Sequence, residues 1–466
     1  MADRDELGNG HLLRAAAERS VRYLDGVQER DVIPSPEALA ALERLDHKLP
    51  DAPGDPAETI ALLDELGSPA TVASAGPRFY GFVVGGSLPV GLAANWLAGA
   101  WDQNAGMVAL SPVAARLEEI AQRWLLDVLG LPPTATVGFV TGATMANLSG
   151  LAAGRHEVLR RAGWDVEAQG LFGAPPVTVV VGDEVHPSVM KALGVLGFGR
   201  DRVVRVPVDT QGRMRVDAFP DVNEPAIVCL QAGNVNTGAV DPLDELVPLA
   251  RERGAWVHVD GAFGLWAAAA PSRAHLVRGI DGADSWATDA HKWLNVPYDS
   301  GLAFVRDGAA LQSAMAVSAA YLPLDTVREP ALLTPEMSRR ARGVEVWAVL
   351  RALGRQGLAE LIERDCRHAR RFAEGLTAAG FTILNDVVLN QVLVEFGDDE
   401  QTRQAIAAIQ QDGTCWAGVT TWQGHVAMRI SVSSWATTED DVEASIEAMV
   451  RAAARAGGLR PPAAHR

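Results

Sequence analysis

Cysteine is scarce in this sequence. The 466 residues include three cysteines, Cys229, Cys366 and Cys415, an odd number with no CxxC spacing. Such a set argues against a disulfide framework and against a cysteine-based zinc site. Few unpaired cysteines are typical of proteins that stay in a reducing compartment, so we expect a cytoplasmic protein without a bound metal.

Basic residues and long apolar runs are also lacking. The chain has 41 lysines and arginines against 58 acidic residues, which makes a net charge of −17 at pH 7. An acidic surface repels nucleic acids and anionic membranes, so neither is an expected partner. The polar start, MADRDELGNG, has no signal-peptide core, and an apolar stretch such as 265–271 is too short to span a bilayer. These absences indicate a soluble, intracellular protein.

The chain is too long for one compact core, and its pattern of apolar residues changes twice. Residues 1–70, which include a linker-like segment at 49–58, predict an N-terminal helical arm. Residues 71–335 alternate β-branched runs with amphipathic stretches, which predicts an α/β domain with a large, mostly parallel sheet covered by helices. Residues 336–466 predict a small C-terminal α+β domain. The expected strands of the large domain are 177–183, 202–208, 226–232, 256–262 and 301–306.

Two charged residues follow predicted strands of the large domain, where parallel sheets place their ligands. Lys292 stands in TDAHKWLNVPYDSG after His291, at the end of a predicted strand. An ε-amine in such a place can condense with an aldehyde, and the alternative is a solvated surface lysine. Asp260 ends the apolar strand WVHVD, where a buried acid needs a cationic partner such as a protonated pyridine nitrogen. The alternative for Asp260 is an Asp–Gly turn with Gly261.

Three further strand ends carry polar or small residues. Ala143 and Thr144 open a predicted helix, whose first N–H groups can bind phosphate, and the alternative is an ordinary capped loop. His186 lies between a predicted strand and a predicted helix, where it can stack on an aromatic cofactor or simply pack in a loop. Asn234 and Asn236 follow another strand, where they can donate to a phenolate oxygen of a cofactor or form a turn.

The order of these features along the chain is specific: phosphate loop, histidine, polar turn, aspartate, lysine. In this order the chain resembles the group II pyridoxal phosphate (PLP)-dependent amino-acid decarboxylases, which include aromatic amino-acid and glutamate decarboxylases. The motifs HVDGA and AHKW carry the resemblance, and the segments 77–86, 111–125 and 338–347 match blocks elsewhere in the family. The resemblance covers nearly the whole chain and implies the fold type I architecture of aspartate aminotransferase.

The resemblance also implies a role for each residue of the predicted cofactor site. Lys292 forms the aldimine with PLP, Asp260 pairs with the pyridine nitrogen, and His186 stacks on the ring and helps to move protons. Ala143, Thr144 and His291 help to hold the phosphate, and Ala262 packs on the other face of the ring. Family members are dimers with active sites at the subunit interface, so a homodimer is expected.

The implied reaction is the loss of CO2 from an L-amino acid, followed by protonation of Cα to give an amine. In the family a loop tyrosine delivers this proton. The corresponding stretch here, 322–337, contains no tyrosine, and Tyr321 lies just before it. Oxygen-dependent aldehyde formation, transamination and Cα–Cβ cleavage therefore stay open as alternatives. A catalytically degenerate relative that serves as a binding protein is a further alternative, and the intact set of Lys292, Asp260 and His186 argues against it.

Two further positions depart from the family pattern. Met145 stands where the family more often has glutamate, and Asp289 stands where the aromatic decarboxylases usually have asparagine. A carboxylate near a phosphate is repulsive unless it points elsewhere or is itself paired. The sequence therefore leaves the role of Asp289 open.

The predicted substrate is a small molecule, an amino acid with an aromatic or apolar side chain. Phe79, Tyr80 and Phe82 lie in blocks that line the substrate pocket in the family, and packing is the alternative for each. Arg429 occupies a block where fold type I aminotransferases keep a carboxylate-binding arginine, so we expect it to bind the substrate α-carboxylate if the enzyme transaminates. The arginines of SRRARG (338–343) match a family cluster or form internal ion pairs.

Overall fold

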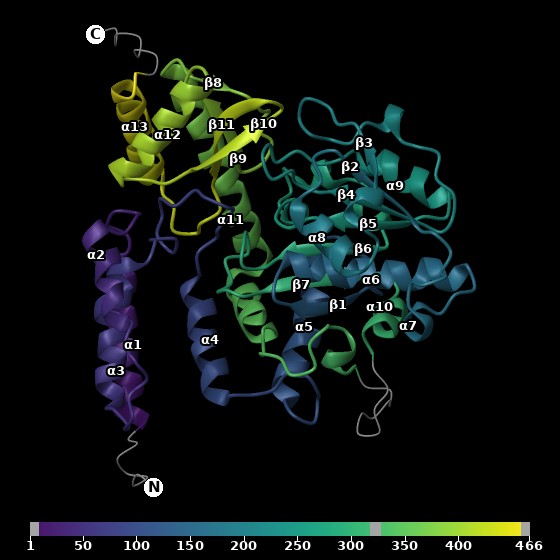
Figure 1. Ribbon diagram of the computed structural model, residues 1–466, viewed down its shortest axis with the longest axis horizontal. Coiled ribbons are helices and arrows are strands. Elements are labelled where there is room, and N and C mark those ends of the chain that lie inside the picture. Colours follow the sequence, from purple (N-terminus) through teal and green to yellow (C-terminus); the bar gives the residue numbers. More distant parts are fainter. Residues whose placement is uncertain (1–8, 317–327, 458–466) are drawn as a thin grey trace.

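The computed structural model describes residues 9–316 and 328–457, which form two sheets and their surrounding helices (Figure 1). A bundle of N-terminal helices stands at one edge of the molecule, the larger sheet lies in the large domain, and the smaller sheet lies in the C-terminal part. Boundaries near residues 70 and 335 remain our proposal for where these parts meet. Within the described ranges, no helix combines the length and the apolarity needed to cross a membrane.

The larger sheet has seven strands in the order β1-β7-β6-β5-β4-β2-β3. Their bounds are β1 Thr136–Val140, β2 Thr178–Gly182, β3 Val204–Val206, β4 Ala226–Gln231, β5 Trp256–Asp260, β6 Ser285–Asp289 and β7 Gly301–Val305. Strands β6, β5, β4, β2 and β3 pair in parallel, whereas β7 runs antiparallel to β6 and β1. The predicted mostly parallel sheet is confirmed. Parallel strands end at a common edge, so β5 and β6 bring their last residues together.

Helices of the large domain surround this sheet, some in contact with its strands and others packed on neighbouring helices. Their bounds are α4 Pro89–Trp101, α5 Pro112–Val128, α6 Ala143–Arg161, α7 Val166–Gln169, α8 Pro187–Val195, α9 Leu243–Glu252 and α10 Gly308–Met315. Helix α6 lies across β5, β6 and β7. Two glycines permit its close approach to β5: a Cβ on Gly150 would lie 2.9 Å from the His258 ring, and one on Gly154 would lie 2.7 Å from the Trp256 ring. Small residues on α6 therefore bring polar side chains of the helix within reach of the strand.

The C-terminal part is built on a second sheet. Its elements are α11 Gly343–Ala378, β8 Thr382–Ile383, β9 Gln391–Glu395, α12 Asp399–Asp412, β10 Gly418–Trp422, β11 His425–Ser431 and α13 Glu439–Arg455. The strands run antiparallel in the order β10-β11-β9-β8. Helix α11 bends at Gly354, whose φ of 59° few other residues adopt without strain. The side chains of Asp398 and Thr438 begin α12 and α13 with capping boxes.

The N-terminal arm consists of α1 Asn9–Gly26, α2 Pro36–Ala41 and α3 Pro56–Ala70. Ser35 caps α2, and Asp55 caps α3, in each case with proline at the first helical turn. The predicted linker at 49–58 is therefore too long at its end. Asp55 and Pro56 are a helix start, because the Asp55 carboxylate accepts from the N–H of Ala57.

Candidate active site

Lys292 and Asp260 lie at the same edge of the large sheet. Strands β5 and β6 are parallel neighbours with Asp260 opposite Ala287, and Lys292 follows Asp289, the last residue of β6, by three positions. Asp260 is 4% exposed, and the Lys292 side chain is 17% exposed. Lys292 Nζ lies 3.0 Å from Asp289 Oδ2. A solvated surface lysine does not fit this position, because its amine is mostly buried and paired.

Asp260 accepts hydrogen bonds from three neutral groups. Asn147 Nδ2 lies 3.1 Å and Ser188 Oγ 3.5 Å from Oδ2, and the Ala262 N–H donates to Oδ1 at 3.1 Å. The last contact is the one that an Asp–Gly turn makes, so the turn is present as well. Neutral donors stabilise a carboxylate without cancelling its charge. Asp260 can therefore hold a cation from outside the chain, such as a protonated ring nitrogen.

Behind Asp260 lies a chain of hydrogen bonds that the sequence analysis missed. His258 Nε2 lies 2.9 Å from Asn147 Oδ1, and the Ser285 hydroxyl donates to His258 Nδ1 at 2.8 Å. Ser285 Oγ in turn accepts from Trp256 Nε1 at 2.9 Å. Asn147 donates its amide N–H to Asp260, so its oxygen accepts and His258 carries its proton on Nε2. Burial lowers the pKa of His258 to about 3, which keeps the ring neutral. The chain holds Asn147 in the orientation that Asp260 needs.

His186 is held by the helix that follows it. It is the N-cap residue of α8, directly before Pro187, and the Ser188 N–H donates to its Nδ1 at 3.2 Å. The neutral ring therefore carries its proton on Nε2. Burial lowers the pKa of His186, while the charge of Asp260 opposes this effect. Ser188 contacts both His186 and Asp260, so the two predicted residues share a partner.

His291 lies between an aromatic ring and a carboxylate. Its Nδ1 accepts from the Ser300 N–H at 3.1 Å, which leaves the proton on Nε2, 3.5 Å from Asp289 Oδ1. The Tyr298 ring stacks on it with centroids 4.2 Å apart. Burial lowers the pKa of His291 and raises the pKa of Tyr298 to about 12. Both rings are therefore neutral at pH 7, and His291 can donate to an anion.

The predicted phosphate loop lies beside these groups. Ala143 is the first residue of α6, and its N–H donates to Asp289 Oδ1 at 2.5 Å. Thr144 follows on the first turn and is half-buried. A Cβ on Gly142 would lie 3.1 Å from His291 Cε1, so a glycine lets the helix start close to the histidine. The structure thus brings Ala143, Thr144, His291 and Lys292 to one place, with a carboxylate among them.

Asn234 makes the turn that was its alternative interpretation. Its Oδ1 accepts from the N–H groups of Asn236 and Thr237 at 2.9 and 3.2 Å, and Asn236 Oδ1 accepts from Thr420 of β10. Asn234 Nδ2 is buried without a hydrogen-bond partner among the described residues, 2.8 Å from where a Cβ on Gly212 would lie. A contact from Asn234 to a cofactor stays a prediction.

The predicted substrate aromatics separate into two groups. Phe79 and Phe82 both stack on Trp416, with centroids 5.1 and 5.5 Å apart, and Phe82 is 64% exposed. Tyr80 instead is buried in the C-terminal core, edge-on to Phe372, with its hydroxyl bonded to a serine of α13. Tyr80 is 1% exposed, and its neighbour Phe79, which pairs with Trp416, points to the opposite side, so the structure gives no support to the predicted substrate contact of Tyr80.

Arg429 on β11 is a half-buried cation. Burial lowers its pKa, and no carboxylate among the described residues counters that effect. Its charge lowers the pKa of His186, which places the guanidinium within electrostatic reach of the site. The arginines of SRRARG differ, since each pairs within the chain. The pairs are Arg339 with Glu118, Arg340 with Glu345, and Arg342 with Asp299.

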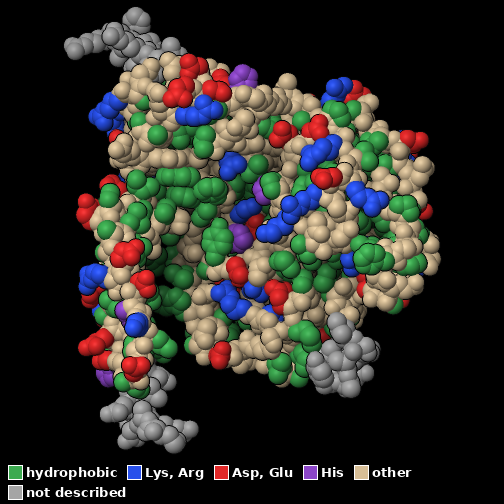
Figure 2. Space-filling view, in the orientation of Figure 1, with side chains coloured by type: hydrophobic (Ala, Val, Ile, Leu, Met, Phe, Trp, Pro, Cys, Tyr) green, Lys and Arg blue, Asp and Glu red, His purple; other side chains and the backbone are tan. Residues whose placement is uncertain are grey.

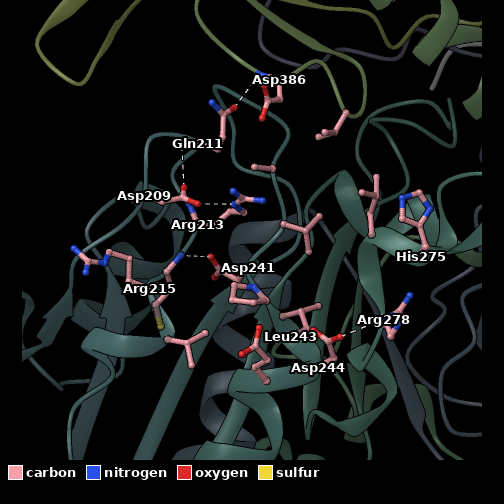
Figure 3. Close-up of a pocket in the computed structure, with 18 residues that line it drawn as sticks. Asp209, Gln211, Arg213, Arg215, Asp241, Leu243, Asp244, His275, Arg278 and Asp386 are labelled. Atoms are coloured by element: carbon pink, nitrogen blue, oxygen red, sulfur yellow. Dashed lines mark hydrogen bonds and ion pairs between the residues drawn. The ribbon is translucent and has the colours of Figure 1, made fainter.

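A cleft of about 480 Å³ is lined by none of the predicted site residues (Figure 3). Four of its charged side chains form two ion pairs: Arg213 Nε lies 2.7 Å from Asp209 Oδ2, and Arg278 Nη1 lies 3.9 Å from Asp244 Oδ2. Asp241, which lines the cleft, accepts from two backbone N–H groups, and burial raises its pKa to about 6. Internal contacts account for these charges, so we assign the cleft no chemistry.

Comparisons with known proteins identify the family. The family profile described as "Pyridoxal-dependent decarboxylase conserved domain" matches residues 39–396. The chain belongs to this family of pyridoxal-dependent decarboxylases. An aromatic-L-amino-acid decarboxylase of Bacillus atrophaeus is 28% identical over 368 residues, 75% of this chain and 73% of the relative. A phenylacetaldehyde synthase of Arabidopsis thaliana is 25% identical over 432 residues, 85% of this chain and 87% of the relative.

Among solved structures, Oryza sativa TDC with PLP and tryptamine superposes with a TM-score of 0.89 at 23% identity, covering 97% of this chain and 99% of that one. This likeness confirms the predicted fold type I architecture. Family membership confirms the predicted cofactor, PLP, and the predicted enzyme class, a PLP-dependent amino-acid carboxy-lyase. The buried carboxylate of Asp260, which has only neutral donors, and the amine of Lys292 fit that cofactor. Within the described ranges, no cluster of three or more histidine, cysteine or acidic side chains could hold a metal.

Proposed function

We propose that this enzyme removes the α-carboxylate of an L-amino acid with an aromatic or apolar side chain, with PLP held on Lys292. The observation that carries the proposal is the pair of neighbouring strand ends, Asp260 on β5 and Lys292 just after β6, with both side chains largely buried. Bound PLP would supply a sink for the electrons that remain on the substrate when CO2 leaves. The side chains of the protein bind, orient and transfer protons.

The residues around Lys292 have distinct proposed tasks. Asp260 pairs with the pyridine nitrogen, and its neutral donors leave its charge available for that pairing. His186 stacks on the ring with its proton on Nε2, because Nδ1 caps α8. The phosphate and the remaining ring contacts fall to Ala143, Thr144, His291, Ala262 and Asn234. These residues would orient the cofactor, and the substrate would bind on the side of the cofactor opposite to them.

Arg429 and Phe82 are the proposed substrate contacts from that side. The Arg429 guanidinium attracts the α-carboxylate, since no carboxylate among the described residues occupies it. Phe82, 64% exposed and stacked on Trp416, offers an apolar surface to a side chain. The bond perpendicular to the cofactor ring breaks most easily. Loss of CO2 requires the carboxylate in that position, whereas transamination requires the Cα–H bond there.

An oxygen-dependent, aldehyde-forming reaction is the second candidate. The described part of the loop, 328–337, has no tyrosine, and Tyr321 lies outside the described residues. A phenylacetaldehyde synthase is among the relatives.

Decarboxylation to an amine needs another donor for the Cα proton. Of the tyrosines in the described ranges, Tyr23 contacts Thr71 in the arm and Tyr80 is buried in the core, whereas Tyr298 lies on His291. We propose Tyr298, whose raised pKa keeps its proton, as the donor to Cα.

The test is to incubate the purified protein with PLP and a panel of L-amino acids, and to measure CO2, amine, aldehyde and hydrogen peroxide. Equal amounts of CO2 and amine support decarboxylation. Aldehyde with peroxide and without amine would replace it with the second candidate, and a keto acid without CO2 would indicate transamination. The Tyr298→Phe variant should shift the product from amine toward aldehyde if Tyr298 delivers the proton.

We further propose a cytoplasmic homodimer. Apolar side chains gather where the N-terminal arm faces the rest of the molecule (Figure 2), around a cleft of about 900 Å³ lined by α1, α3, α4 and Trp435. Leu63 of α3, which lines this cleft, is 59% exposed, and Leu97 of α4 is 56% exposed. Exposed apolar surface of this extent is typical of interfaces, and the dimeric family offers a second copy as the occupant.

Light scattering of purified protein tests the dimer. Leu97→Glu should produce monomers or weaken the dimer. Phe172→Glu is the matched control, since Phe172 is 98% exposed and follows α7, away from the arm (Figure 1). A wild-type monomer, or a Leu97→Glu dimer as tight as wild type, would contradict this proposal.

A further inference from the structure

Asp289 contacts three residues that are proposed to hold the cofactor. It is the last residue of β6 and is 2% exposed. One carboxylate oxygen accepts from the Ala143 N–H at 2.5 Å and lies 3.5 Å from His291 Nε2, and the other lies 3.0 Å from Lys292 Nζ. A single buried carboxylate thus contacts a proposed phosphate N–H, a proposed phosphate histidine and the proposed cofactor lysine.

The position of this carboxylate is one that suits an anion. Ala143 is the first residue of α6, so its N–H has no partner within the helix and lies at the positive end of the helix dipole. Phosphate groups bind at such helix starts for the same reason. Asp289 therefore offers to α6 the same interaction that a cofactor phosphate would offer.

The backbone around this carboxylate is closely packed. A Cβ on Gly142 would lie 3.3 Å from Asp289 Oδ1, and one on Gly301 would lie 2.4 Å from Gly142 Cα, so β7 packs directly on the loop before α6. The Asp289 backbone is also fixed, because its N–H donates to the Ala262 carbonyl and its carbonyl accepts from Trp266 Nε1. Neither the loop nor the strand end can withdraw without breaking these contacts. Only the side chain of Asp289 is left to move.

We propose that Asp289 competes with the cofactor phosphate for the start of α6. Its carboxylate stabilises α6 and Lys292 in the cofactor-free protein and weakens the binding of PLP. This inference rests on the proposed cofactor site. An asparagine at this position could donate a hydrogen bond to the phosphate and would bind the cofactor more tightly. The aspartate repels the phosphate instead.

The test compares Asp289→Asn with wild type in full-length protein freed of cofactor. Two ligands differ only in the phosphate: PLP and pyridoxal. Asp289→Asn should bind PLP about tenfold more tightly or better, because one repelling charge is gone, and should bind pyridoxal within about threefold of wild type. The cofactor-free variant should unfold at a lower temperature than cofactor-free wild type, whereas the order should reverse when both are saturated with PLP.

Asp284→Asn is the matched control. Asp284 is a largely buried carboxylate just before β6, at the other end of the strand, where it accepts from the Val257 N–H. This variant should lose stability with and without PLP and should not change the preference for PLP over pyridoxal. A merely structural role of Asp289 would give the same pattern in Asp289→Asn and would overturn the competition.

Inorganic phosphate separates this inference from the proposed function. It should raise the unfolding temperature of cofactor-free Asp289→Asn more than that of wild type. If wild type takes up no PLP, the proposed function fails and the phosphate titration still decides the competition. Equal phosphate effects, or weaker PLP binding by Asp289→Asn than by wild type, would show that Asp289 does not compete.

Discussion

The two sides of the proposed site differ in how they are built. Along β5, hydrogen bonds run without a break from Trp256 through Ser285, His258 and Asn147 to Asp260. On the side of β11, Phe82 is exposed, and Arg429 has no carboxylate partner among the described residues. The side of Asp260, called here the bonded side, holds the carboxylate in one position through its hydrogen bonds. The exposed ring of Phe82 and the unpaired guanidinium of Arg429 can bind ligands of different shapes. We therefore expect changes on the first side to alter the reaction and changes on the second to alter substrate affinity.

The largest expected effect is that of Asp260→Asn. An amide keeps the size of the side chain but cannot pair ionically with a protonated ring nitrogen, so turnover should fall by about 100-fold or more. Steady-state kinetics should show the loss in kcat, with KM within a few-fold of wild type. If KM rose and kcat stayed unchanged, the bonded side would bind substrate as well, and the proposed difference between the two sides would be wrong.

His258→Phe should destabilise the folded protein without changing the charge of the site. The phenyl ring leaves Asn147 Oδ1 without its donor and the Ser285 hydroxyl hydrogen without its acceptor, and each buried polar group left unsatisfied costs about 1–3 kcal/mol. Urea unfolding measures this loss. His258→Gln, which can donate and accept at once, should recover part of it. Equal stability of the two variants would mean that the ring is held by packing alone.

Arg429→Gln should weaken substrate binding and leave turnover nearly intact. Losing a charged hydrogen-bond donor to a carboxylate costs about 1.5–3 kcal/mol, which corresponds to a KM roughly 10- to 100-fold higher. Phe82→Ala should raise KM less, since one exposed ring is lost. If KM stays unchanged in Arg429→Gln, the guanidinium does not hold the carboxylate and the second side loses its proposed role.

His258 should also make the protein sensitive to acid. Its pKa is about 3 in the folded protein against an ordinary 6.5, so the unfolded chain binds the extra proton first as pH falls. Stability is complete above about pH 6.5 and declines toward pH 3, with about 2 kcal/mol lost from this group between pH 7 and pH 5. Urea unfolding at the two pH values measures the loss. His258→Gln should lose less over that interval, and an equal loss would assign the acid sensitivity to other groups.

The bonded side was the more predictable of the two. Lys292 and Asp260 follow apolar runs, and parallel strands end at one edge, so their proximity could be inferred from the sequence. The Asn147–His258 contact could not, because it spans 111 residues and depends on how closely α6 lies on β5. Tyr80 shows the limit of a matching block: the block placed the segment but not the face to which each ring turns.

The linker predicted at 49–58 was wrong at its end, although the sequence there carries a local signal for a helix start. Asp55 and Pro56 are a common helix start, and they end the linker that the composition extended to residue 58. Strand β10 could not be predicted from the sequence for a different reason. Most of its side chains are exposed or half-buried, so it carries no continuous apolar run for a sequence pattern to detect.

Borohydride reduction of the protein with bound PLP, followed by peptide mass spectrometry, tests the central claim most directly. We predict a purified protein that is yellow and that, after reduction, carries the phosphopyridoxyl group on the peptide with Lys292. Lys292→Ala should carry none and should release no CO2 from any amino acid. A colourless protein without PLP uptake, or a label on another lysine with activity retained in Lys292→Ala, would contradict the account.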